Sequence, residues 1–271
     1  MVKSLPIRNA AANTGQALVV ILLVLAVAAT VVLSLVSRTV TDITITTKEK
    51  ESSRAFSAAE AGIEEALVGG PANQTLSGGE RYEVNVGVLG EGANEIIWPQ
   101  ESLSGDTVPL WFVSHASDGS LTCADGKCFT GSSVRICWGK EGTPTSDAQT
   151  PAIEASVFYR TSGGSYQIGR AAFDPNSTRR TTNKFGAESG ICAIAGKTFA
   201  FGQTINFSDL GIPSSVYNAA NGLQTARIHF IYNTTTSQPI GFSAPSTFPG
   251  QGSRVTSVGT SGDATRRIEV F

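Results

Sequence analysis

The chain has 271 residues and a mass of 28.2 kDa, enough for one large domain or two small ones with a core that folds unaided. Charged residues make up only 15% of it and the formal net charge is -2, so there is no basic excess to attract phosphates, and nucleic acid is not expected as a partner. A content of 29 glycines against a single methionine is typical of an exported β-rich protein rather than a cytosolic helical enzyme.

The first distinctive feature is a long apolar segment near the N-terminus. No charged residue occurs between Arg8 and Arg38, and residues 17–36 are almost entirely apolar. At ~1.5 Å per residue, about 20 such residues cross the ~30 Å hydrocarbon layer as a helix. The apolar region of a cleaved secretory signal is shorter, usually ~7–15 residues. We therefore expect a transmembrane helix, and Lys3 and Arg8 before it favour a cytoplasmic N-terminus and an exported remainder.

The helix is expected to continue well beyond the apolar segment. From Val36 to Leu67 the chain contains no proline and only one glycine, Gly62. The threonine-rich piece at residues 39–47 also alternates partly like a strand, but no turn residue separates it from the flanking segments. Helix is the preferred interpretation over residues 16–68, and the glycines and proline at residues 69–71 end it.

Two segments in this region resemble the N-terminal part of PilX-type minor pilins of type IV pili. They are Gly-Gln-Ala-Leu-Val-Val at residues 15–20, followed by the apolar segment, and Arg-Ala-Phe-Ser-Ala-Ala-Glu-Ala-Gly at residues 54–62. The resemblance implies that residues 1–15 are a leader, which a prepilin peptidase removes after Gly15. Gln16 would then be the methylated first residue of the mature protein. It also implies that the helix packs against other pilins in a filament built by inner-membrane pilus assembly machinery.

The chain departs from the family pattern at two positions. Most pilins begin the mature chain with Phe and carry Glu at its fifth position, whereas these positions are Gln16 and Val20 here. Processing is still expected, but ordinary packing in a filament shaft is not. The alternative interpretation is a plain single-span anchor that a glycine precedes by chance.

The C-terminus and the segment after the helix suggest a small sheet. Residues 253–270 form two alternating stretches around a glycine-containing turn, which predicts a β-hairpin, and residues 81–89 alternate as an amphipathic strand. A similar terminal hairpin recurs in PilX-type proteins. The resemblance thus implies a pilin-like antiparallel sheet made of residues 69–94 and 249–271 and packed on the helix.

Residues 95–248 are expected to form a large insertion in this sheet. Short strand-like stretches separated by Gly, Ser and Asn turns predict a β-sandwich-like head. The stretches are residues 108–114, 133–138, 153–159, 166–173, 197–207 and 226–232. The predicted fold class is therefore α+β, with a long helix, a small antiparallel sheet and an inserted β-rich head.

Four cysteines allow three pairings in an oxidising compartment. Cys123 and Cys128 enclose a short loop with an Asp-Gly turn, which favours a disulfide between them and a longer link between Cys137 and Cys192. A zinc site is the rival interpretation. It needs two close ligand pairs, and neither Cys137 nor Cys192 has a Cys or His nearby in the sequence.

A catalytic site is not expected. The two histidines, His115 and His229, lie in separate strand-like stretches, and a structural role is the preferred interpretation for both. The sequence contains no nucleophile elbow, phosphate-binding loop or His-Glu-x-x-His motif. We expect no enzyme and no cofactor.

Three further sets of residues have a structural and a functional interpretation. The pairs Asp118-Gly119 and Asp125-Gly126 are either turns or calcium loops, and turns are preferred because calcium needs about six oxygen ligands. The tryptophans are either sandwich core or a ligand platform, with core preferred; they are Trp98, Trp111 and Trp138. Four Asn-x-Ser/Thr triplets need not be glycosylated; they begin at Asn73, Asn176, Asn206 and Asn233.

The function expected from the sequence is that of a minor pilin-like component of a type IV pilus or related secretion filament. It would sit near the tip and prime assembly or present an adhesive head. Before assembly it would be a single-pass membrane protein, and after assembly part of a filament at the cell surface. The alternative is a membrane-tethered extracellular binding module that never enters a filament.

Overall fold

The computed structural model describes residues 14–70, 72–116, 118–124 and 126–271, which form two compact units. The first unit extends to Asn85 and includes Thr256–Ile268. The second consists of Val86–Val255 and Glu269–Phe271. The chain is of the α+β class, with a long apolar N-terminal helix and antiparallel sheets, as the sequence predicts at this level.

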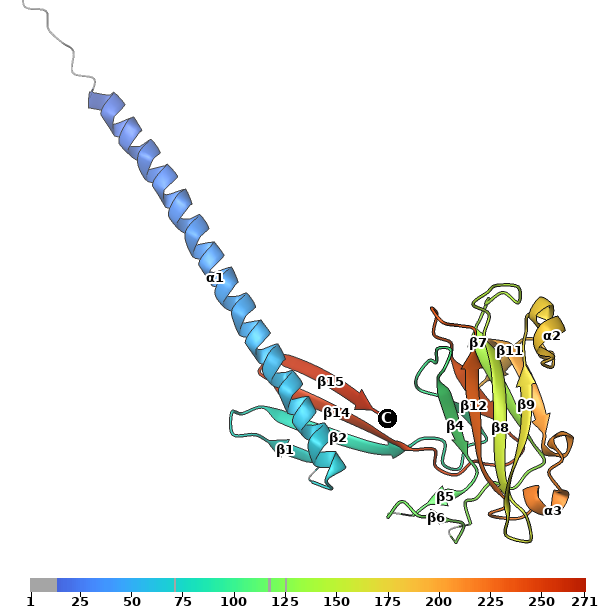
Figure 1. Cartoon of the computed structure of the whole chain (residues 1–271). Helices are drawn as coiled ribbons and strands as arrows, with labels where there is room; N and C mark the ends of the chain where they lie inside the picture. The colour runs from blue at the N-terminus through green and yellow to red at the C-terminus, as the bar shows by residue number, and fades with distance from the viewer. Residues whose placement is uncertain (1–13, 71, 117, 125) are drawn as a thin grey trace, which may run out of the picture. The chain divides into compact units, whose positions relative to one another are not determined.

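The first unit is dominated by α1, a helix of 54 residues from Thr14 to Leu67 (Figure 1). The threonine-rich piece is helical throughout, so the strand alternative is wrong. No turn residue interrupts the helix here, and four of the five threonine hydroxyls in this piece donate to the carbonyl oxygen four residues earlier, at 2.8–3.0 Å. The donors are Thr39, Thr41, Thr44 and Thr46. The amide of Gly70 donates to the carbonyl of Glu65 at 2.7 Å where the helix ends.

A small sheet in the order β1-β2-β14-β15 accompanies the helix. Its strands are β1 (Asn73–Thr75), β2 (Arg81–Val88), β14 (Ser253–Ser261) and β15 (Ala264–Val270). The second half of α1 buries small side chains, among them Ala55 and Ala59, and Gly259 of β14 lies against their backbone. Because the side chains at this contact are small or absent, the helix and the sheet approach closely. Tyr82 of β2 is fully buried, and burial, followed by the nearby charge of Glu65, raises its pKa.

The second unit contains two larger antiparallel sheets. The four-stranded sheet has the order β4-β12-β8-β9: β4 (Thr107–Trp111), β8 (Ala152–Arg160), β9 (Tyr166–Phe173) and β12 (Leu223–Ile231). The five-stranded sheet has the order β10-β11-β7-β13-β3: β3 (Glu95–Ile97), β7 (Ser133–Lys140), β10 (Cys192–Ile194), β11 (Lys197–Asn206) and β13 (Ile240–Ser243). A short hairpin pairs β5 (Ser114–His115) with β6 (Leu121–Thr122), and the helical turns are α2 (Ser177–Asn183), η1 (Phe207–Leu210) and α3 (Ser214–Tyr217).

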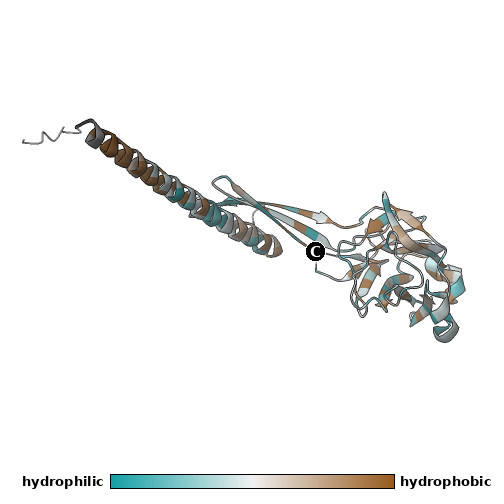
Figure 2. Cartoon of the chain, turned by 90° about the horizontal axis from the view of Figure 1, so that it is seen from above, coloured by the Kyte–Doolittle hydropathy of each residue, from teal (hydrophilic) through white to brown (hydrophobic). Residues whose placement is uncertain are grey.

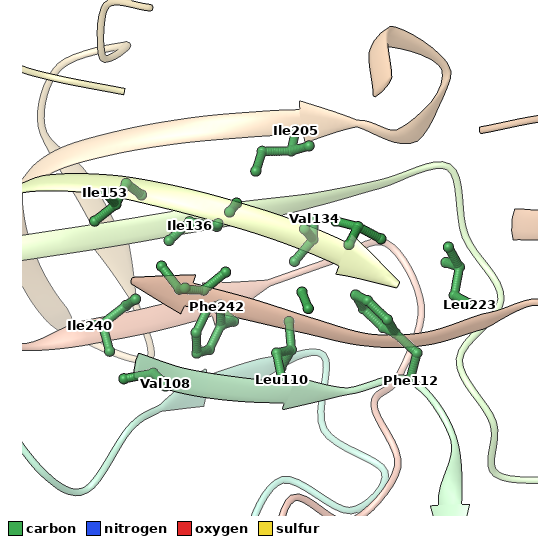
Figure 3. Close-up of a cluster of buried hydrophobic side chains, with 14 of the residues drawn as sticks. Val108, Leu110, Phe112, Val134, Ile136, Ile153, Ile205, Leu223, Ile240 and Phe242 are labelled. Carbon is green, nitrogen blue, oxygen red and sulfur yellow. The ribbon is translucent and has the colours of Figure 1, made fainter. Parts of the chain in front are cut away.

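One hydrophobic core lies between these two sheets. Every second side chain points inward, so that Leu110 and Ile153 of the four-stranded sheet belong to the same buried cluster as Ile136 and Phe242 of the five-stranded sheet (Figure 3). Burial of each such side chain contributes about 1.5–3 kcal/mol. Trp138 is also buried here, and its indole N–H donates to the carbonyl of Pro151 at 3.0 Å.

The expected strand over residues 108–114 is too long, because β4 ends at Trp111. At Trp111, the side chain of Gln251 hydrogen-bonds to the open edge of β4, on the side away from β12. Its Oε1 accepts from the Trp111 amide at 2.7 Å, and its Nε2 donates to the Trp111 carbonyl at 3.0 Å. The next residue, Phe112, still donates its amide to the Gln224 carbonyl at 3.0 Å, and Ser114 and His115 pair separately with β6.

Candidate functional site

The first candidate surface is the apolar half of α1. Its side chains from Leu18 to Val36 are exposed, and Figure 2 shows the change from this apolar half to a mixed second half. It is the one helix in the described part of the chain that is long and apolar enough to cross a membrane. An exposed apolar surface of this length is incompatible with water, which agrees with the expected single-pass membrane topology.

The residues predicted for processing lie at the beginning of this helix. Gly15 and Gln16 belong to its first turn, and Val20 presents an exposed aliphatic side chain one turn later. Lys3 and Arg8 fall outside the described residues, as does most of the predicted leader. The first carboxylate along the helix is that of Asp42.

Both disulfides in the structure have the pairing that the sequence favours. Cys123 is joined to Cys128, with the Cα atoms 5.3 Å apart, and Cys137 to Cys192, with the Cα atoms 5.6 Å apart. The second link connects β7 to β10 beside Gly202 of the intervening β11, where a side chain would collide with Cys192. In the described ranges, no group of three or more His, Cys, Asp or Glu side chains is placed to hold a metal ion.

The two histidines lie in different sheets. His115 is exposed on β5, and its ring meets that of Trp111 edge-on at a centroid distance of 4.6 Å. His229 lies on β12, where its Nδ1 is 3.2 Å from the Thr107 hydroxyl, and Glu154 is its register partner on the other side. This row of hydroxyl, imidazole and carboxylate lies on the middle of a sheet. From Thr225 to His229, β12 is paired with β4 on one side and β8 on the other, so the backbone around His229 is engaged in the sheet and does not form an oxyanion hole.

The remaining candidates divide between structural and exposed positions. Trp98 and Trp138 are buried, which agrees with the core interpretation, whereas Trp111 is half-buried on an outer face. Asn176 and Asn233 are also buried. The side chain of Asn176 caps α2 and that of Asn233 donates to the Ser102 carbonyl at 2.8 Å. The other two triplets begin at exposed asparagines, Asn73 and Asn206.

Asp118 closes the turn of the β5–β6 hairpin. Its Oδ1 accepts from the hydroxyl of Ser120 at 2.6 Å and from the Ser120 amide at 2.9 Å. These hydrogen bonds lower the pKa of the Asp118 carboxyl. The arrangement is that of an Asx turn. Asp125, the other candidate calcium ligand, lies outside the described residues.

A second candidate surface, which the sequence analysis missed, is a hollow of about 610 Å³ on the outer face of the four-stranded sheet. We call it the outer hollow. Three neighbouring strands, β4, β12 and β8, each contribute three outward side chains to it. At one end Thr225 lies between Trp111 and Phe158, and at the other end His229 lies between Thr107 and Glu154.

Comparison of the chain with protein-family models, curated proteins and solved structures finds no match.

The candidate functional features are therefore the apolar half of α1 and the outer hollow. The first belongs to a helix whose side chains are exposed from Leu18 to Val36. The second is a depression on a paired sheet that combines aromatic, cationic, anionic and hydroxyl groups.

Proposed function

We propose that this protein is a minor pilin-like subunit of a type IV pilus or related secretion filament. The observation that carries the proposal is α1, a single continuous helix whose first half is apolar on all sides and whose second half packs on an antiparallel sheet. A helix that is hydrophobic all round requires a lipid or protein environment. A bilayer before assembly and the apolar core of a filament afterwards would each supply one.

The resemblance of residues 15–20 and 54–62 to PilX-type minor pilins supports this assignment. The second of these segments supplies Ala55, Ala58 and Ala59, the small buried side chains at the sheet contact. The C-terminal hairpin of β14 and β15 belongs to the same sheet as β1 and β2. This sheet is the pilin-like part of the proposal.

The proposed orientation places the N-terminus in the cytoplasm and the rest of the chain outside. Lys3 and Arg8 precede the span without an acidic neighbour, which favours their retention in the cytoplasm. Both disulfides lie beyond the span, in the second unit. Disulfides persist in oxidising compartments, so they fit an exported second unit.

Within the filament, we place this subunit at or near the tip. In the type IV family, the glutamate at the fifth mature position is thought to neutralise the N-terminal ammonium of the preceding subunit. An unpaired buried charge costs several kcal/mol, and Val20 offers no carboxylate. A repeat of this protein against itself would therefore leave each ammonium without a partner. A first-added subunit has no predecessor to neutralise.

The mass of the mature N-terminal peptide tests the processing step. We expect the mature protein to begin at Gln16 with a methylated amine. Gly15→Leu is expected to block cleavage while the protein stays in the carbonate-resistant membrane fraction, because the apolar segment is unchanged. A native protein that begins at Met1, or far beyond Gln16, would contradict the proposal.

The same measurement decides between the filament subunit and a membrane-tethered binding module. The departures at Gln16 and Val20 are the observation that keeps the tether as the second candidate. A tether retains residues 1–15 and remains in the membrane fraction when filaments are sheared from the cells. A filament subunit loses residues 1–15 and is recovered with the sheared filaments.

A further inference from the structure

The two outer faces of the second unit differ in how they are covered. On the five-stranded sheet, the disulfide Cys137–Cys192 packs with Ile194 and Phe199 into a small buried cluster over the strands. On the four-stranded sheet, apolar side chains remain in contact with water. Tyr166 and Ile168 of β9 are 70% and 46% exposed, and the outer hollow lies on the three strands beside them.

The shape of the outer hollow follows from the sizes of its side chains. Trp111 and Phe158 lie in register on either side of Thr225, so two strand spacings, or about 9.5 Å, separate their backbones. The small Thr225 side chain between two large aromatic ones leaves a slot. His115 meets the Trp111 ring edge-on, which holds the indole in place. A slot beside a fixed indole suits a saturated ring that stacks on the aromatic face through the C–H groups of one of its faces.

The guanidinium group of Arg227 defines one side of the slot. Arg227 is exposed at the middle of β12 and lies over the Phe158 ring, 5.5 Å from its centroid. This contact orients five N–H donors beside the space next to Trp111. Further along the same hollow, Glu154 supplies acceptor oxygens, and its Oε1 is 3.5 Å from the Ser156 hydroxyl.

The groups that line the outer hollow indicate which class of ligand it can bind. A hydroxyl group both donates and accepts hydrogen bonds, so different hydroxyls of one ligand can accept from Arg227 and donate to Glu154. One arginine and one glutamate line the same hollow. A polyanion would be attracted by Arg227 but repelled by Glu154, and a cation would be attracted by Glu154 but repelled by Arg227. The volume of about 610 Å³ lies within the range of small-molecule sites.

We propose that the outer hollow binds a neutral glycan, with one sugar ring stacked on Trp111 beside Arg227 and the hydroxyls of a further sugar bonded to Glu154 at the other end of the hollow. The inference goes beyond the proposed assembly role, because binding needs neither cleavage after Gly15 nor entry into a filament. Failure of N-terminal processing would therefore leave it intact, and failure of glycan binding would leave the assembly role intact.

The test uses the full chain in a zwitterionic detergent whose headgroup contains no sugar. The protein is applied to an array of neutral oligosaccharides of glucose, galactose, mannose and N-acetylglucosamine, beside sulfated oligosaccharides and oligo-dT. The best neutral oligosaccharide is then titrated by calorimetry. We expect saturable binding of at least one neutral oligosaccharide that persists in high salt, because no net charge is neutralised.

Three substitutions locate the site. Trp111→Ala is expected to raise Kd about tenfold through the loss of stacking, and Trp111→Phe to restore part of the affinity. Arg227→Ala provides a second variant, at an exposed position, and is also expected to weaken binding. Tyr166→Ala removes an exposed aromatic ring from the same sheet but outside the hollow, and should leave Kd unchanged.

Several results would overturn the inference. One is the absence of binding to every neutral oligosaccharide on the array. Another is binding that neither Trp111→Ala nor Arg227→Ala changes. A third is binding of oligo-dT or sulfated oligosaccharides alone, with a steep loss of affinity in salt, which would identify a polyanion site instead.

Discussion

At the scale of single residues, the contact between α1 and its sheet depends on the absence of a side chain. Gly259 of β14 lies so close to α1 that a Cβ atom there would overlap the carbonyl oxygen of Ala55 and the amide nitrogen of Ala59. These are backbone atoms of a helix, which do not move aside by changing a rotamer. Any side chain at residue 259 must therefore displace the helix from the sheet.

Gly259→Ala is expected to weaken this contact by about 1–3 kcal/mol, the usual cost of overpacking. Hydrogen exchange measured on the full chain in detergent should show lost protection of the α1 amides between Ala55 and Ile63. The control is Gly87→Ala in β2, since a Cβ there meets no atom within 4 Å. Equal protection in the two variants would mean that the close approach does not stabilise the unit.

A second residue-scale feature is the buried carboxylate of Asp174. It accepts two hydrogen bonds from Arg179, at 2.7 and 3.0 Å, and one from Asn183 at 2.8 Å. Arg179 also donates to the Thr150 carbonyl at 2.7 Å and lies over the Tyr232 ring, 4.1 Å from its centroid. The ion pair and these contacts therefore hold α2 against the rest of the second unit.

Asp174→Asn is expected to lower the free energy of unfolding of the second unit by about 2–4 kcal/mol, because it leaves the Arg179 charge without its buried partner. Tryptophan fluorescence during urea unfolding measures this unit alone, since all three tryptophans belong to it. Glu101→Gln is the matched control. Glu101 pairs with Lys140 at 3.0 Å on the surface, and loss of such a pair costs at most about 1 kcal/mol. Similar costs for the two variants would contradict the assigned importance of burial.

At the scale of elements, the two disulfides constrain loops of very different length. Their sequence separations are 5 residues for Cys123–Cys128 and 55 residues for Cys137–Cys192. In the chain-entropy model, a loop of the shorter length contributes about 2 kcal/mol and one of the longer length about 4 kcal/mol. The longer link also belongs to the buried cluster that covers the five-stranded sheet.

The paired substitution Cys137→Ala with Cys192→Ala should thus destabilise the second unit more than Cys123→Ala with Cys128→Ala. Urea unfolding followed by tryptophan fluorescence compares the two variants, and peptide mapping of the native protein checks the pairing. Mapping that finds Cys128 joined to Cys137, or a larger loss from the shorter loop, would contradict this ranking.

At the scale of the whole molecule, the proposed role predicts where the protein lies in a filament. A first-added subunit needs no carboxylate at Val20, and an additional unit of this size, Val86–Val255, is easier to accommodate at an end than in a closely packed helical array. Immunogold labelling of the second unit on intact filaments is expected to mark the ends. Quantitative mass spectrometry should find it far below the major subunit. Uniform labelling along the shaft at near-equal stoichiometry would refute the tip position.

The sequence by itself determined the features that depend on neighbouring residues. The apolar residues 17–36 and the absence of proline up to Leu67 predict α1 because helix formation needs only local hydrogen bonds. Strand-like stretches between Gly, Ser and Asn turns likewise predict the longer strands, including β8, β9 and β12. The six strands of two to four residues were missed. They are too short to show an alternating pattern. These strands are β1, β3, β5, β6, β10 and β13.

Only the tertiary structure decided which distant residues meet. β13 is a strand because it pairs with both β7 and β3, and the open edge of β4 at Trp111 is hydrogen-bonded by Gln251, far along the chain. The outer hollow has the same origin, since Trp111, Phe158 and Arg227 come from three strands whose register brings them together. Register between strands is a non-local property, set by packing of the whole core, and a pattern within one strand does not contain it.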